Sequence, residues 1–238
     1  FVALGINIAV ALLALSLSFV SPHRPSEAVT VSSAAEPAAA AGEQSSAVLI
    51  YAVTALSGFT ALGAEVIWTR LLSLMLGATV YTFSIILAVF LLGLGIGSTV
   101  GAALARSSRR PRTALAVCQF LLAVGICWAA FAIAKSLPFW PFDPSMSISP
   151  WIMFQTDIAR ALWAVLPPAI LWGASFPLAL AAVPARKNAD PGALVGRVYA
   201  ANTVGAIFGS LAFSMLVVPA IGTLHGQQLL AAAALVSA

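Results

Sequence analysis

Long apolar runs alternate with short polar segments along most of the chain. A helix needs about 20 mainly apolar residues to cross the hydrocarbon core of a bilayer. Such runs occupy residues 1–20, 47–76, 80–105, 113–137, 156–183, 194–219 and 224–238, and the last of them looks cut short. The pattern predicts an all-α protein, a polytopic transmembrane bundle of about seven spans.

One polar segment is much longer than the others. Residues 21–46 are rich in Ala, Ser, Glu and Pro and show no apolar periodicity. This composition is typical of a disordered linker. We therefore expect a transmembrane helix over residues 1–20, a disordered linker over residues 21–46 and a six-span transmembrane bundle over residues 47–238.

Two further features interrupt the apolar pattern. Residues 138–155 carry Trp140 and Trp151, which suits a loop anchored by aromatic side chains at a membrane interface. The run 156–183 contains three prolines, which remove backbone donors and predict kinks or a broken helix. These prolines are Pro167, Pro168 and Pro177.

The composition supports a lipid environment. Of the 238 residues, 61% are hydrophobic and only 8% are charged, whereas soluble domains are about half apolar and about a quarter charged. Because these few polar groups cannot cover a water-exposed surface, the lipid bilayer must be the solvent for much of the chain.

The net charge of +4 comes from two short basic clusters between apolar runs. A nucleic-acid site would need a long basic patch with interleaved aromatic residues, so no nucleic-acid partner is expected. Short Lys/Arg-rich loops stay in the cytoplasm. This rule places loops 106–112 and 184–193 in the cytoplasm together with the linker 21–46. The turn at Gly77, the loop 138–155 and the turn at Gly222 then face outward.

Candidate catalytic and metal-binding groups are sparse. Cys118 and Cys127 lie nine residues apart in one apolar run, too far along a helix to form a disulfide, and are expected to pack as small apolar residues. His23 and His225 are isolated from other ligands. Because no phosphate loop, nucleophile elbow or HExxH motif is present, we expect no enzyme activity, metal or cofactor on these residues.

The most informative polar groups follow Gly58 in one apolar run. Glu65 is the acid expected deepest in the membrane, and Arg70 reaches the outer interface. Five residues separate them, about 140° around a helix, so they are not a natural pair. We expect Glu65 to meet a polar group on another helix. The candidate intramembrane polar site comprises Glu65, Trp68, Arg70 and Arg160, with Trp163, Thr82 and Ser84 as further possible partners of Glu65.

Two interpretations of Glu65 remain open. A charged or polar side chain is costly in hydrocarbon and needs a reason to be there. The first reason is a proton or cation site, and the second is a structural hydrogen bond between helices.

Glycines recur at intervals of four in two runs. Such spacing places a smooth stripe on one helix face and permits close helix contact. A substrate groove lined by backbone is the less ordinary alternative. The predicted packing residues are Gly93, Gly97 and Gly101 in one run, and Asn202, Gly205 and Gly209 in another.

Two stretches carry a resemblance to a known family. Residues 57–98 read SGFTALGAEVIWTRLLSLMLGATVYTFSIILAVFLLGLGIGS, and residues 195–222 read VGRVYAANTVGAIFGSLAFSMLVVPAIG. Both resemble the membrane region of fused, major-facilitator-like spermidine synthase homologues. Together they cover about a third of the chain.

The resemblance implies the architecture and the location. The runs would correspond to helices 6–12 of a major-facilitator-like fold, with residues 1–20 ending a preceding repeat. The location would be the bacterial inner membrane. A cytoplasmic aminopropyltransferase-like domain would be a partner of the bundle, and this chain contains no such domain.

Three functions follow from this interpretation. The favoured one is a membrane-embedded anchor, scaffold or docking bundle of a spermidine-synthase-like protein. The first alternative is a secondary transporter of a polyamine or another small cation, which Glu65 favours but the scarcity of other buried acids opposes. The second alternative is an accessory subunit that packs with other membrane subunits of a larger complex.

Overall fold

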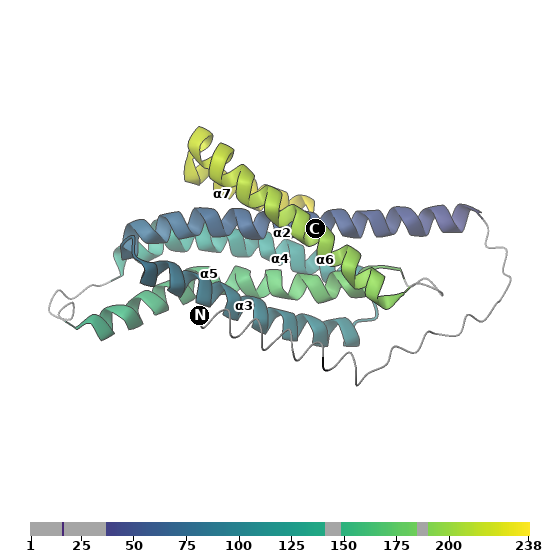
Figure 1. The fold of residues 1–238 in the computed structure, drawn as a ribbon, viewed down its shortest axis with the longest axis horizontal. Helices are drawn as coiled ribbons and strands as arrows, with labels where there is room; N and C mark the ends of the chain where they lie inside the picture. The colour runs from purple at the N-terminus through teal and green to yellow at the C-terminus, as the bar shows by residue number, and fades with distance from the viewer. Residues whose placement is uncertain (1–15, 17–36, 141–148, 185–189) are drawn as a thin grey trace. The chain divides into compact units, whose positions relative to one another are not determined.

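The protein is described here by a computed structural model that covers residue 16 and residues 37–140, 149–184 and 190–238. The secondary structure within these ranges is helical (Figure 1). The predicted helix over residues 1–20 lies outside the described residues except at residue 16. The longer elements are α2 (Pro37–Leu76), α3 (Val80–Ser107), α4 (Pro111–Phe131), α5 (Pro150–Ala182), α6 (Pro191–Ala212) and α7 (Val218–Val236).

Short irregular helices extend two of these elements. The π-helix η1 (Ala132–Ser136) and the 3-10 helix η2 (Leu137–Phe139) continue α4, and the π-helix η4 (Phe213–Val217) joins α6 to α7. Residues 132–139, the last two of which were expected to begin a loop, are therefore helical.

Five helical stretches are long and apolar enough to cross a membrane, which confirms the prediction of an all-helical protein with membrane-spanning elements. They are Ser46–Leu76, Val80–Ser107, Pro111–Phe139, Pro150–Ala182 and Pro191–Val236. The expected count of about seven is not reached among the described residues. One expected span lies outside them, and the runs 194–219 and 224–238 fall in the single stretch Pro191–Val236.

Two glycines make the turns that reverse the chain at one end of the bundle. Gly77 (φ +94°) lies between α2 and α3, and Gly222 (φ +79°) interrupts α7. A positive φ is readily adopted only by glycine. Thr79 then caps α3 by accepting a hydrogen bond of 3.2 Å from the backbone N–H of Thr82.

The structure differs from the sequence analysis at two boundaries and shows no break at the prolines of α5. The linker prediction fails for residues 37–46, because α2 begins at Pro37 and the following alanine-rich sequence has a high helix propensity. Helix α5 begins at Pro150, inside the expected loop, since proline suits the first helical position. The same helix continues unbroken to Ala182 despite its internal prolines.

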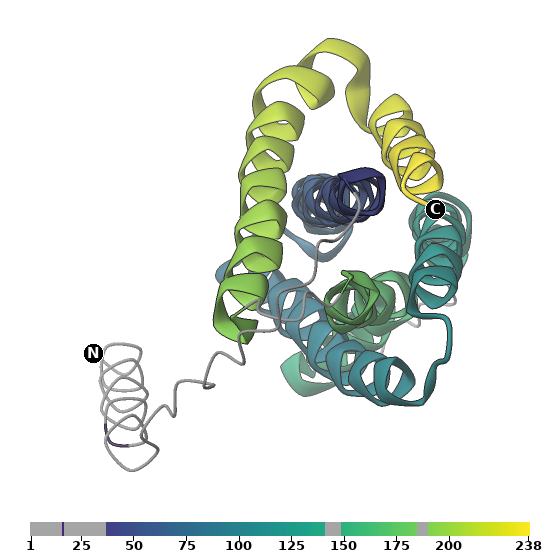
Figure 2. The ribbon, with the colours of Figure 1, turned by 90° about the vertical axis from the view of Figure 1, so that its right-hand side faces the viewer.

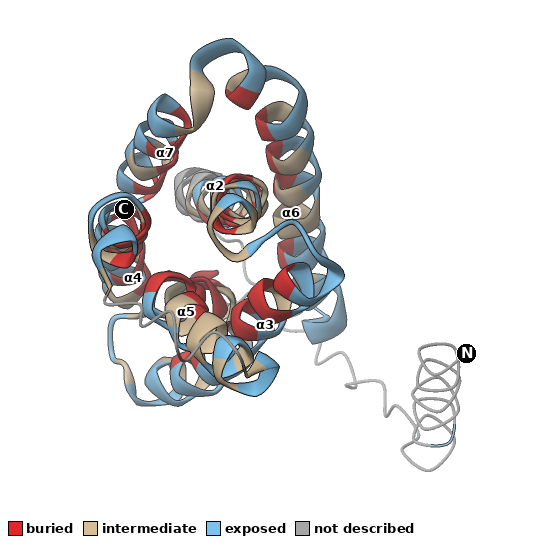
Figure 3. Ribbon diagram, turned by 90° about the vertical axis from the view of Figure 1, so that its left-hand side faces the viewer, coloured by how far each residue is buried: buried red, intermediate tan, exposed pale blue. Residues whose placement is uncertain are grey.

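Helix α2 lies in the middle of the bundle. It contacts α5, α6 and α7, and the end-on views show it between the two arms of the α6–α7 hairpin (Figures 2 and 3). Helix α3 packs against α5, while α4 contacts α5 and α7. The buried faces of the helices point toward this interior (Figure 3). Trp68, Ile67 and Phe213 are among the largest fully buried side chains.

Candidate functional site

Glu65 lies about two-thirds of the way along the membrane-spanning part of α2, Ser46–Leu76, and is half-buried. Within the described ranges its carboxyl group takes part in no hydrogen bond and no ion pair; the ion pair found there joins Asp157 and Arg160. Glu65 therefore remains a polar group without a protein partner among the residues the structure describes.

Within the described ranges, no hydrogen bond or ion pair joins Glu65 to any of its predicted partners, so the expected polar contact is not found there. The side chains of three of them bond within their own helix or its cap, and Trp163 accepts a bond at its main-chain carbonyl. Arg160 pairs with Asp157, the carbonyl of Trp163 accepts from Trp128, the Thr82 hydroxyl lies 3.2 Å from that of Thr79, and Ser84 donates to the carbonyl of Val80. Such local bonds satisfy short polar side chains without a second helix.

Trp68 lies one turn beyond Glu65 and is fully buried. Its ring centroid lies 5.5 Å from that of Trp172 on α5, and the Trp172 ring lies 5.8 Å from Phe90 on α3. The Trp68 Nε1–H has no hydrogen-bond partner among the residues that the structure describes. Trp68 thus belongs to an aromatic cluster that joins α2, α3 and α5.

Neither basic residue of the predicted site forms an ion pair with Glu65 within the described ranges. Arg160 forms its ion pair with Asp157 over 3.4 Å within the first turns of α5, and both side chains are mostly buried. Arg70 is exposed near the end of α2. Hence the structure does not bring the candidate polar residues together as one ionic site.

A polar cluster that the sequence analysis missed joins α2 to α5. The hydroxyl groups of Ser57 and Ser175 lie 3.1 Å apart, and Trp172 Nε1 donates a hydrogen bond of 3.1 Å to Thr60 Oγ1. All four residues are buried. The available signal was the spacing of Thr54, Ser57 and Thr60, which puts three hydroxyls on one face of an apolar helix.

The glycine stripe of α3 packs against the backbone of α5. A Cβ atom added at Gly97 would overlap the carbonyl oxygen of Ile170, and one added at Gly101 would lie 2.6 Å from the Cα atom of Ala174. Gly93 faces Ala169 in the same way. In return, a Cβ at Gly173 of α5 would overlap the Leu94 carbonyl oxygen. The two helices therefore contact each other through glycines on both sides.

Helices α2 and α6 repeat this arrangement. Added Cβ atoms at Gly205 and Gly209 would overlap the carbonyl oxygens of Ala55 and Phe59 on α2. Conversely, a Cβ at Gly58 would overlap the carbonyl oxygen of Asn202 and lie 2.9 Å from its Oδ1 atom. Asn202 thus takes part in the close contact through its main chain.

The described residues offer few groups for metal or redox chemistry. No cluster of three or more His, Cys, Asp or Glu side chains that could hold a metal ion occurs within these ranges. Cys118 is buried, with its Sγ 3.3 Å from the carbonyl oxygen of Leu171, and Cys127 is exposed. Both cysteines are free thiols.

Comparison of the chain with protein-family models finds no matching family, and comparisons with curated proteins and with solved structures find no match either.

Proposed function

We propose that the chain is the membrane-embedded part of a spermidine-synthase-like protein and acts as an anchor and scaffold. In this proposal it lies in the bacterial inner membrane and docks a cytoplasmic aminopropyltransferase-like domain. The helix expected over residues 1–20 and the helices of the described bundle would together correspond to helices 6–12 of a major-facilitator-like fold.

The reciprocal glycine contacts are the observation that carries the scaffold function. In α3–α5 and in α2–α6, each helix places a glycine against a carbonyl oxygen of the other. Carriers alternate access by rocking or gating one helix group against another. Close main-chain contacts at glycines resist a movement of one helix along the other. Such a shift would bring a side chain or a carbonyl group into the space that the glycine leaves free.

The hydrogen bonds between α2 and α5 support the same function. Ser57 with Ser175 and Thr60 with Trp172 satisfy buried polar groups inside the bundle. These hydrogen bonds fix α2 against α5, and they use the hydroxyl hydrogens of Ser57, Thr60 and Ser175, so none of these hydrogens is free to bind a solute.

The scaffold function is tested by reconstitution and by crosslinking. Proteoliposomes that contain the chain should take up radiolabelled spermidine and putrescine no faster than protein-free liposomes, with or without a pH gradient. A photo-crosslinking amino acid at exposed Arg109, in the loop expected to face the cytoplasm, should crosslink to an aminopropyltransferase-like domain. Saturable uptake, or crosslinks to lipid only, would contradict the proposal.

The orientation is tested separately with reporter fusions. A fusion after Ser108 should report cytoplasm, and a fusion after Gly222 should report the outer side, because the basic clusters flank the former. The structure places the start of α4 beside the end of α5, where Arg112 Nε lies 3.4 Å from the Ala182 carbonyl oxygen. If the fusion after Ser108 reported the outer side and the fusion after Gly222 reported the cytoplasm, the orientation of the whole bundle would be the reverse of the one expected.

Glu65 favours a second candidate function, secondary transport of a polyamine or another small cation. An unpaired carboxyl group inside a membrane span is the type of group that binds a proton or a cation in carriers. If the chain is a carrier, Glu65→Gln should abolish uptake in the same proteoliposomes while the thermal stability stays unchanged. If it is a scaffold, neither variant nor wild type shows uptake.

A further inference from the structure

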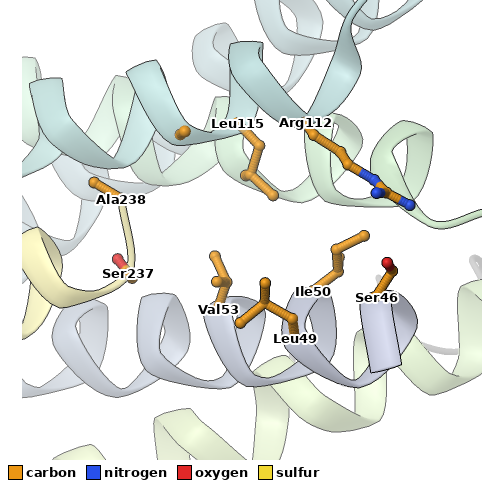
Figure 4. A pocket seen from close by; sticks show the side chains of 9 residues that line it. Ser46, Leu49, Ile50, Val53, Arg112, Leu115, Ser237 and Ala238 are labelled. Carbon is orange, nitrogen blue, oxygen red and sulfur yellow. The ribbon is translucent and has the colours of Figure 1, made fainter. Parts of the chain in front are cut away.

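A pocket of about 130 Å³ lies between the early part of α2, the start of α4 and the last residues of the chain (Figure 4). The residues that line it come from elements far apart in the sequence. They are Ser46, Leu49, Ile50 and Val53 of α2, Arg112, Leu115 and Ala116 of α4, and Ser237 with Ala238.

The middle of the pocket is apolar. Leu49, Ile50 and Val53 face it from α2, and Leu115 faces it from α4 (Figure 4). An apolar protein cavity of about 150 Å³ binds a molecule the size of benzene. The pocket is therefore large enough for a short part of a hydrocarbon chain.

Arg112 carries the only charged side chain among the nine lining residues. Its guanidinium lies at the same end of the pocket as Ser46 (Figure 4). The Nε atom donates a hydrogen bond of 3.4 Å to the carbonyl oxygen of Ala182, which holds the side chain in place. The two terminal nitrogens make no hydrogen bond to any residue that the structure describes, so they are available to an anion.

The surroundings of Arg112 add positive potential. It is the second residue of α4, whose N-cap residue Arg110 provides no side-chain hydrogen bond to the first-turn N–H groups. Uncapped N–H groups at a helix start favour negative charge. Arg106 and Arg109, which precede it closely in the sequence, are exposed, and basic clusters beside membrane spans attract anionic lipids.

We propose that this pocket binds an anionic phospholipid, with one acyl chain against the apolar lining and the phosphate group on Arg112. A lipid fits this pocket because the apolar lining and the cationic end lie together beside a membrane span. An anionic headgroup complements a site whose charged group is an arginine. This binding site is independent of the scaffold function.

Native mass spectrometry of the purified 238-residue chain tests the proposal. Titration with phosphatidylglycerol should give a tighter first binding event than titration with phosphatidylcholine of the same chains. Arg112→Gln should weaken phosphatidylglycerol binding about fivefold, the value expected for one basic residue near anionic lipid. Arg109 and Arg112 are both exposed, but only Arg112 lines the pocket. Arg109→Gln therefore removes the same charge outside the pocket and should change the affinity less than twofold, and Arg112→Lys should retain most of it.

A second pair of variants tests the apolar part. Ala116→Phe fills the pocket and should abolish the preferred lipid binding event, whereas Val117→Phe, on the exposed face next to it, should leave that event intact. Circular dichroism and thermal melts identify any variant that fails to fold, and Ala116→Leu then replaces Ala116→Phe.

Three results would overturn the proposal. Equal affinities for Arg112→Gln and Arg109→Gln would show that overall charge, not this site, binds the lipid. Competition by glycerol 3-phosphate as strong as that by phosphatidylglycerol would show an anion site without an acyl chain. A dimer of the wild type that Ala116→Phe converts to a monomer would show that a second copy occupies the pocket.

Discussion

Trp128 Nε1 donates a hydrogen bond of 3.0 Å to the carbonyl oxygen of Trp163, which joins α4 to α5. In a regular helix this carbonyl would accept from the N–H four residues later, but that residue is Pro167, which has no N–H. The indole therefore replaces the missing donor. This explains how α5 accommodates a proline that the sequence alone marked as a break.

The relationship predicts a coupled effect of Trp128 and Pro167. Trp128→Phe should destabilise the bundle by about 1 kcal/mol beyond the loss of ring contacts, because it leaves a carbonyl unpaired. Pro167→Ala restores a backbone donor. The loss of stability caused by Trp128→Phe should therefore fall by about the same amount when it is made in the Pro167→Ala protein. Thermal or chemical unfolding of the four proteins in detergent measures this coupling, and purely additive effects would disprove the replacement.

Gly95 and Gly97 provide a matched pair on α3. Gly97→Ala should destabilise the protein by about 1–3 kcal/mol, because its Cβ would overlap the main chain of Ile170 and force α3 away from α5. A Cβ at Gly95 would meet no atom within 4 Å, so Gly95→Ala should be neutral or stabilise the helix by up to about 1 kcal/mol. Equal melting temperatures for the two variants would contradict the proposed close contact.

These glycines show how far the sequence could predict the structure. Their spacing of four indicated a smooth helix face, because side chains at that interval share one side. It could not indicate which helix would cover that face, since the partners Ile170 and Ala55 are ordinary apolar residues. The choice of neighbours depends on the packing of the whole bundle, which no local pattern encodes.

The polar residues were harder to predict for a different reason. The sequence marks Glu65 as costly in hydrocarbon but contains no information about its neighbours in space. The clearest hydrogen bonds between helices instead involve Ser57 and Thr60, whose hydroxyl groups bond to Ser175 and Trp172 of α5. Their spacing on one face was the usable signal.

Thr60 gives a test of the bonds between α2 and α5. Thr60→Val keeps the shape but removes the acceptor for Trp172 Nε1 and the donor to the Ser57 carbonyl. A buried indole N–H without a partner should lower the stability by about 1–2 kcal/mol. Thr60→Ser keeps the hydroxyl and is the control, with an expected loss below about 1 kcal/mol. A Thr60→Val protein as stable as Thr60→Ser would show that the hydrogen bond contributes nothing.

Substitutions of Glu65 test whether its side chain has a hydrogen-bond partner. Removing the carboxyl group should change the melting temperature in opposite directions in the two cases. Glu65→Gln and Glu65→Leu remove the carboxylate, and the leucine also removes every polar atom. Since the structure gives Glu65 no hydrogen bond or ion pair within its described ranges, Glu65→Leu should keep or raise the melting temperature by relieving the cost of a polar group in hydrocarbon. Loss of stability in Glu65→Leu with rescue in Glu65→Gln would instead reveal a structural hydrogen bond, and would require a partner outside the described residues. Thermal melts of both variants in detergent and in lipid nanodiscs distinguish these outcomes.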